Sequence, residues 1–74
     1  MPANRATLLE LRNRYRRAYT SYLSCVKALS DVALNATRPS EQLIDSEARS
    51  LKEMNDAREA LLRAIFEQIE TSAR

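Results

Sequence analysis

Apolar residues recur through the first half of the chain at alternating spacings of three and four positions. This spacing places side chains on one side of an α-helix, and four unbroken heptads are typical of helices that pack along their whole length. The pattern predicts a helix from about residue 4 to about residue 34, capped by Asn4 or Thr7. Its apolar seam consists of Leu8, Leu11, Tyr15, Ala18, Tyr22, Cys25, Leu29 and Val32.

The periodic pattern stops at residues 35–39, which predict a turn. Asn35 is the best candidate for a left-handed C-terminal residue in a chain that contains no glycine. Pro39 suits the start of a second helix, which Thr37 or Ser40 can cap. Because so short a connection brings consecutive helices back on each other, we expect the two helices to lie antiparallel and adjacent.

A second helix is predicted from about residue 40 to about residue 71, so that residues 1–74 form a single helical hairpin. Its predicted apolar stripe consists of Ile44, Ala48, Leu51, Met54, Leu61, Ile65 and Ile69, with Leu62 and Phe66 widening it near the end. A hairpin folded about residues 36–37 places Cys25 opposite Ala48 and Tyr15 opposite Arg58.

Two helices share only one line of contact, which leaves several apolar side chains without a neighbour. Leu9, Tyr19 and Leu23 lie off the predicted seam of the first helix. We therefore expect an all-α antiparallel hairpin that pairs into a dimeric four-helix bundle, or binds a helical partner protein in place of a second copy. The predicted core and interface residues are Leu8, Leu11, Tyr15, Tyr22, Leu29, Ile44, Leu51, Met54, Leu61, Leu62, Ile65, Phe66 and Ile69.

The 74 residues include no glycine, histidine or tryptophan and a single cysteine. Glycine-rich phosphate loops need positive φ angles, and histidine is the commonest general base and metal ligand. We therefore predict no catalytic residues, no metal and no cofactor. Cys25 has no histidine to activate it, and its expected role is that of a small buried hydrophobic residue.

Arg58 interrupts the predicted stripe of the second helix, with Asn55 beside it. An unpaired buried guanidinium is costly, so the residue needs an aromatic or acidic partner. The favoured interpretation is a polar layer of Arg58, Asn55 and Tyr15 that fixes register and oligomeric state. The alternative is an anion-binding site built from the same side chains.

Charge is unevenly distributed although the net charge is only +2. Residues 1–37 carry six basic and two acidic side chains, and residues 38–74 carry six basic and eight acidic side chains, so the two halves attract each other. The basic residues Arg5, Arg12, Arg16 and Lys27 form a stripe that can also neutralise phosphates. A nucleic-acid-binding dimer is therefore the alternative to a protein-binding module.

No apolar run reaches the about 18 residues that a membrane span requires, and the first residues lack the apolar core of a signal peptide. We expect a cytoplasmic protein that does not bind membranes. The expected architecture resembles the helical hairpins of the Rop family, which dimerise into four-helix bundles, and the hairpin co-chaperones and needle subunits of bacterial secretion systems. This likeness implies a non-enzymatic, self-associating protein-interaction or chaperone-like adaptor module.

Overall fold

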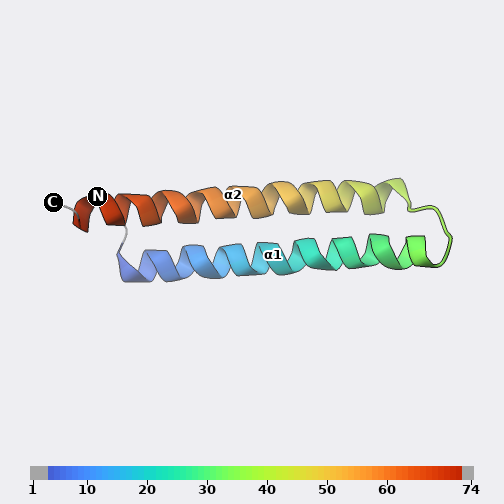
Figure 1. Cartoon of the computed structure of the whole chain (residues 1–74), viewed down its shortest axis with the longest axis horizontal. Helices are drawn as coiled ribbons and strands as arrows, with labels where there is room; N and C mark the ends of the chain where they lie inside the picture. Colours follow the sequence, from blue (N-terminus) through green and yellow to red (C-terminus); the bar gives the residue numbers. More distant parts are fainter. Residues whose placement is uncertain (1–3, 73–74) are drawn as a thin grey trace.

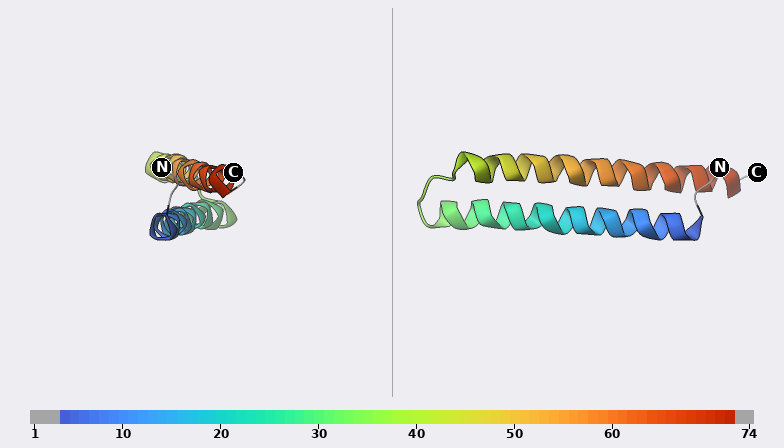
Figure 2. Two further views of the ribbon diagram at one scale, coloured as in Figure 1. Left: turned by 90° about the vertical axis from the view of Figure 1, so that its left-hand side faces the viewer. Right: turned by 180° about the vertical axis from the view of Figure 1, so that it is seen from behind.

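The computed structural model describes residues 4–72, which form two helices joined by one turn (Figure 1). Helix α1 spans Arg5–Leu34 and helix α2 spans Glu41–Ser72. The two helices pack against each other, and the described residues contain no strand. The hairpin is a rod of 57 × 16 × 15 Å, and both described ends of the chain lie at the end opposite the turn (Figure 2).

Helix α1 begins as the sequence predicts. The Asn4 side chain accepts a hydrogen bond from the backbone N–H of Thr7 at 2.8 Å, which satisfies one of the free donors of the first turn. Asn4 is therefore the N-cap, and Thr7 lies inside the helix.

The end of α1 differs from the prediction in its left-handed residue. Asn35 keeps a negative φ of −89°, and Ala36 adopts the positive φ of 56°. The backbone N–H of Thr37 donates to the carbonyl of Val32, and that of Ala36 donates to the carbonyl of Ala33. This is the Schellman pattern with alanine at the position where glycine is favoured. Asn35 instead uses its side-chain amide to bond the carbonyl of Asp31, at 2.9 Å.

Helix α2 begins after Pro39, which belongs to the turn. The Ser40 hydroxyl accepts a hydrogen bond from the backbone N–H of Leu43 at 3.2 Å. Ser40 is thus the N-cap, one of the two candidates that the sequence offered.

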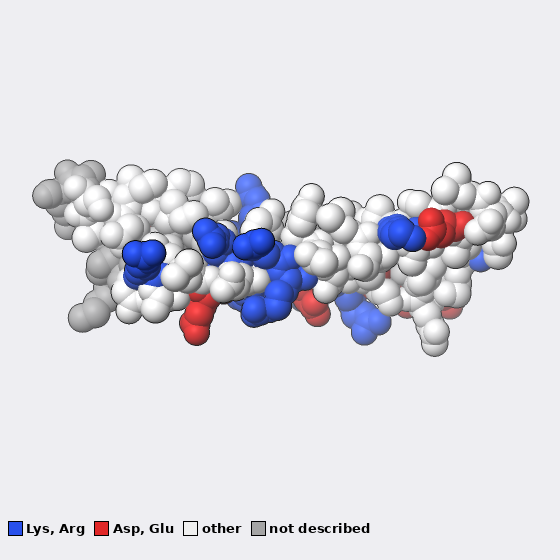
Figure 3. Space-filling model, turned by 90° about the horizontal axis from the view of Figure 1, so that it is seen from below, with Lys and Arg blue, Asp and Glu red and all other residues white. Residues whose placement is uncertain are grey.

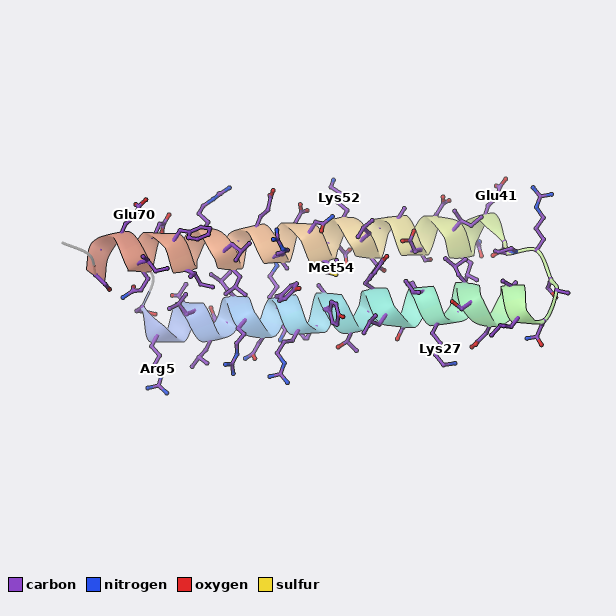
Figure 4. The ribbon with its side chains drawn as sticks, viewed as in Figure 1. Arg5, Lys27, Glu41, Lys52, Met54 and Glu70 are labelled. Atoms are coloured by element: carbon purple, nitrogen blue, oxygen red, sulfur yellow. The ribbon has the colours of Figure 1, made fainter. Side chains whose placement is uncertain are left out.

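The seam of α1 lies where the heptads predict it, and each of its residues from Leu8 to Val32 is half-buried. The seam of α2 does not follow the predicted stripe. The α2 positions turned toward α1 include the two most buried residues of the hairpin, Ala57 at 1% exposure and Ala64 at 7%. The full α2 seam is Leu43, Glu47, Ser50, Met54, Ala57, Leu61, Ala64 and Gln68. Met54, which the prediction included, points into the space between the helices (Figure 4).

The register also differs from the prediction by two residues. The Sγ atom of Cys25 lies 3.2 Å from the Oγ atom of Ser50, in hydrogen-bonding contact across the hairpin. Cys25 therefore faces Ser50 and not Ala48, which is exposed. The same register places Ala57 level with Ala18. Small side chains thus face each other at the middle of the rod, which lets the two helices approach closely.

The hairpin has almost no fully buried core. No large side chain among the described residues is fully buried, and only Ala57 and Ala64 are classed as buried. The accessible surface is 6030 Å², whereas a compact protein of 8.5 kDa exposes about 4,700 Å². The radius of gyration is 16.7 Å, against about 11 Å for a compact chain of this length. The rod shape leaves much apolar surface exposed.

Candidate functional site

One side of the hairpin is defined by the residues that directly follow each seam residue. A step of one residue turns a helix by about 100°. Because α1 and α2 run in opposite directions, the residue after each seam residue lies on the same side of the hairpin in both helices. The residues of this apolar face are Leu9, Arg12, Arg16, Tyr19, Leu23, Val26, Ser30 and Ala33 from α1, and Ile44, Ala48, Leu51, Asn55, Arg58, Leu62, Ile65 and Ile69 from α2.

The opposite side is defined by the residues that directly precede each seam residue. This polar face contains no large aliphatic or aromatic side chain, and Ala28 and Ala60 are its apolar members. Its residues are Thr7, Glu10, Arg14, Arg17, Ser21, Ser24, Ala28 and Asp31 from α1, and Gln42, Ser46, Arg49, Glu53, Asp56, Ala60, Arg63 and Glu67 from α2. The hairpin is therefore strongly two-sided.

Large hydrophobic side chains on the apolar face are open to solvent. Leu23 is 48% exposed, Ile44 is 49% exposed and Ile69 is 57% exposed. Leu51, Leu62 and Ile65 are half-buried at the edge of the seam. Exposed hydrophobic side chains gathered on one side of a small protein are a common feature of interaction sites.

Polar residues of the apolar face gather at the middle of the rod. Arg58 and Asn55 are both exposed there, one turn apart on α2. The prediction that Arg58 lies within the stripe facing α1 is wrong, because Ala57 takes that place and Arg58 turns outward. Tyr15 belongs to the seam and is half-buried. Arg58 and Asn55 thus form the polar part of the α2 side of this face, which α1 does not cover.

The predicted basic stripe is divided between two directions. Arg12 and Arg16 lie on the apolar face, while Arg5 and Lys27 extend away from α2 (Figure 4). Lys27 donates a hydrogen bond to Asp31 at 2.7 Å, and this bond raises the pKa of the lysine. Basic side chains gather over the N-terminal half of α1 and give way to a mixed surface toward the turn (Figure 3).

The tyrosines hold different positions around α1. The rings of Tyr15 and Tyr19 lie 6.1 Å apart at a tilt of 49°, which joins the seam to the apolar face. Tyr22 lies on the seam, where partial burial and then the negative charge of Glu47 raise the pKa of its hydroxyl. Burial and a nearby negative charge both disfavour the ionised phenolate, which accounts for the direction of the shift.

A shallow depression on the polar side is lined by Cys25, Ser46, Arg49, Ser50 and Glu53. Cys25 is a half-buried free thiol that is already in contact with Ser50. Within residues 4–72, no three cysteine, histidine or acidic side chains gather closely enough to hold a metal ion. A second depression follows the outer side of α2 between Glu59 and Glu70, beside Phe66.

The structure divides the predicted core and interface residues into three groups. Half-buried seam residues are Leu8, Leu11, Tyr15, Tyr22, Leu29, Met54 and Leu61. Half-buried residues beside the seam are Leu51, Leu62 and Ile65. Exposed residues are Ile44, Phe66 and Ile69.

Sequence reasoning missed the small and polar residues of the α2 seam. Ala57 and Ala64 are spaced one heptad apart, and that spacing is the signal that marks a site of close helix approach. Ser50 could not be recognised in this way, because a polar serine is not counted as part of an apolar stripe.

No protein-family model matches the chain, and no curated protein and no solved structure is significantly similar to it. Neither described helix is long and apolar enough to cross a bilayer.

Proposed function

We propose that this chain is a non-enzymatic protein-interaction module that self-associates through its apolar face. The observation that carries the proposal is the contrast between the two sides of the hairpin, since Leu23, Ile44 and Ile69 are exposed on one side and no comparable residue lies on the other. Selection for solubility alone does not place large hydrophobic residues on one exposed side.

The available area supports a partner of standard size. The hairpin exposes about 1,300 Å² more surface than a compact protein of its mass, and a stable interface buries about 800 Å² from each partner. A second hairpin covers such a surface because its own apolar face has the same length and composition. The result is a four-helix bundle with the polar faces outward.

Two neighbouring residues provide a matched test. Leu23 lies on the apolar face and Ser24 on the polar face, and both are exposed in the hairpin. We expect Leu23→Asp to produce monomers and Ser24→Asp to remain dimeric in light scattering after size-exclusion chromatography. A monomeric wild-type chain, or equal dimerisation of both variants, contradicts the proposal.

The alternative function is nucleic-acid binding by a dimer, favoured by the basic side chains that gather along α1 (Figure 3). Arg14 and Arg17 lie on the polar face and stay accessible when the apolar face is covered. Binding of duplex RNA or DNA that falls steeply with added salt, and that an Arg14→Ala/Arg17→Ala variant loses, supports this function. Binding that is absent at low salt excludes it.

A further inference from the structure

The residues that α2 contributes to the apolar face follow a similar order of apolar and polar types from either end of the helix. The midpoint of Glu41–Ser72 lies between Asp56 and Ala57. Residues at equal distances on the two sides of this midpoint form four pairs: Asn55 with Arg58, Leu51 with Leu62, Ala48 with Ile65, and Ile44 with Ile69. The pair farthest from the midpoint thus consists of two large aliphatic residues, and the pair nearest to it consists of the two polar residues.

We propose that a second copy of this chain sits on the apolar face about a two-fold axis perpendicular to the rods, so that the two turns lie at opposite ends of the bundle. This inference rests on the self-association proposed above and specifies its geometry. The axis lies between the two copies, level with the midpoint of α2, and lays each α2 antiparallel on the α2 of the other copy.

This arrangement gives Arg58 a polar neighbour. The side chain of Arg58 meets Asn55 of the second copy, whose amide oxygen accepts hydrogen bonds from a guanidinium. The contact occurs twice, once on each side of the axis. An arginine in an apolar interface needs such a partner, and any shift along the rod replaces it with an aliphatic side chain.

Charges at the edge of the α2 contact agree with the same axis. Lys52 and Glu59 lie on the outer side of α2, beside the apolar face. The axis brings Lys52 of one copy to within about 3 Å, measured along the rod, of Glu59 of the other copy. Each of these two side chains therefore lies near a side chain of opposite charge.

The α1 helices are related by the same axis. Because Ala57 is level with Ala18, the axis lies between the levels of Ala18 and Tyr19, and each Tyr19 meets its own copy near the axis. Arg16 then lies within about 3 Å of the level of Leu23 of the second copy, and no arginine on the apolar face of α1 faces another.

The competing arrangement has both turns at one end and α1 packed on α2 of the second copy. Because Cys25 is level with Ser50, Arg16 is nearly level with Arg58. The same-end bundle therefore places Arg16 of one copy against Arg58 of the other, twice, with no acidic residue on the face between them. Like charges opposed in a closed interface select against this arrangement.

A distance between spin labels on the two turns tests the orientation. The labelled chain is Thr37→Cys in a Cys25→Ser background, which keeps a hydroxyl partner for Ser50. Light scattering first establishes that the labelled chain is a dimer, and a monomer refutes the self-association. For a dimer, turns at opposite ends give a label separation of roughly 50 Å, since each helix of about 30 residues is about 45 Å long. A separation below about 25 Å overturns the inference while leaving self-association intact.

Cross-linking supplies an independent readout in the same background. Chains carrying Leu51→Cys are mixed with chains carrying Leu62→Cys and oxidised. We expect disulfide-linked heterodimers from the mixture and little linkage within either variant alone, because each cysteine faces the other position across the axis. Equal linkage in the single-variant samples contradicts the proposed axis.

Discussion

Cys25 and Ser50 meet across the hairpin, with the thiol sulfur and the hydroxyl oxygen 3.2 Å apart. This contact marks which face of α2 packs on α1. The seam there includes the small and polar residues Ser50, Ala57 and Ala64, and Ile44, Ile65 and Ile69 lie on the apolar face beside it. The proposed self-association rests on that arrangement.

The Schellman turn predicts a stabilising substitution. Ala36 holds a φ of 56°, a conformation that costs a non-glycine residue about 1–2 kcal/mol. We expect Ala36→Gly to raise the free energy of unfolding by about 1 kcal/mol, less than the full strain because glycine gains entropy in the unfolded chain. Chemical denaturation at one fixed protein concentration measures the change. Ala28→Gly, inside α1, is the control and is expected to destabilise by about 1 kcal/mol.

The close approach at Ala57 predicts intolerance of larger side chains. Ala57 is 1% exposed, so Ala57→Leu forces the helices apart, and we expect a loss of about 1–3 kcal/mol in unfolding free energy. Ala6→Leu, at an exposed position near the start of α1, serves as the control and should change stability by less than about 0.5 kcal/mol. Equal stability of the two variants in denaturant titrations contradicts the assigned seam.

The Tyr22 hydroxyl predicts a stability loss in alkaline solution. Its folded-state pKa lies above the ordinary value of 10.0, through partial burial and the charge of Glu47. The protonated phenol is thus favoured by folding, and this contribution is complete below pH 10 and lost as the pH rises through the folded-state pKa. The hydrogen bond to Asp31 also raises the pKa of Lys27, so the stability that this bond contributes is likewise lost as the pH rises through the folded-state pKa of the lysine.

Glu47→Gln tests the electrostatic part of this account. We expect the substitution to lower the pKa of Tyr22, because the amide carries no charge and leaves only the effect of burial. Tyrosinate absorbance, compared with that of a Tyr22→Phe variant, isolates the titration of this residue. An unchanged Tyr22 titration in Glu47→Gln shows that the carboxylate does not act on the phenol.

Substitution of Arg58 is expected to affect the stability of the bundle and the orientation of its two copies differently. Replacing it with leucine removes the need to satisfy a guanidinium in the interface, so we expect Arg58→Leu to unfold at the same or a higher denaturant concentration. The same variant should lose its single orientation, and the distribution of turn-to-turn distances should become bimodal. A large loss of stability with one unchanged distance argues against the polar layer.

Helix positions, the turn and the α1 seam could be predicted from sequence because each depends on local signals. Asn4 and Ser40 cap their helices through bonds to residues three positions away, and one stripe of α1 keeps an unbroken heptad spacing. The helices end within two residues of their predicted limits. The predictions that include residues 1–3, 73 and 74 extend outside the part of the chain that the structure describes.

The α2 seam could not be predicted in the same way, because α2 carries two stripes that differ by one residue. Hydrophobicity favours the stripe through Ile44, Leu51 and Ile65, but the hairpin packs α1 against the stripe through Ser50, Ala57 and Ala64. A pattern counts apolar residues and does not weigh how closely small side chains let two helices approach. Met54 and Leu61 of the predicted stripe lie on the seam, and its other residues lie on the apolar face.

Completion of the core by a second copy makes thermal unfolding depend on protein concentration. Circular dichroism is recorded over a thousandfold range of protein concentration, with the mass followed by sedimentation equilibrium. We expect a mass of twice 8.5 kDa at high concentration and a melting temperature that rises steadily with concentration, since association stabilises only the folded state. A mass of 8.5 kDa with one cooperative melting temperature at every concentration contradicts this expectation.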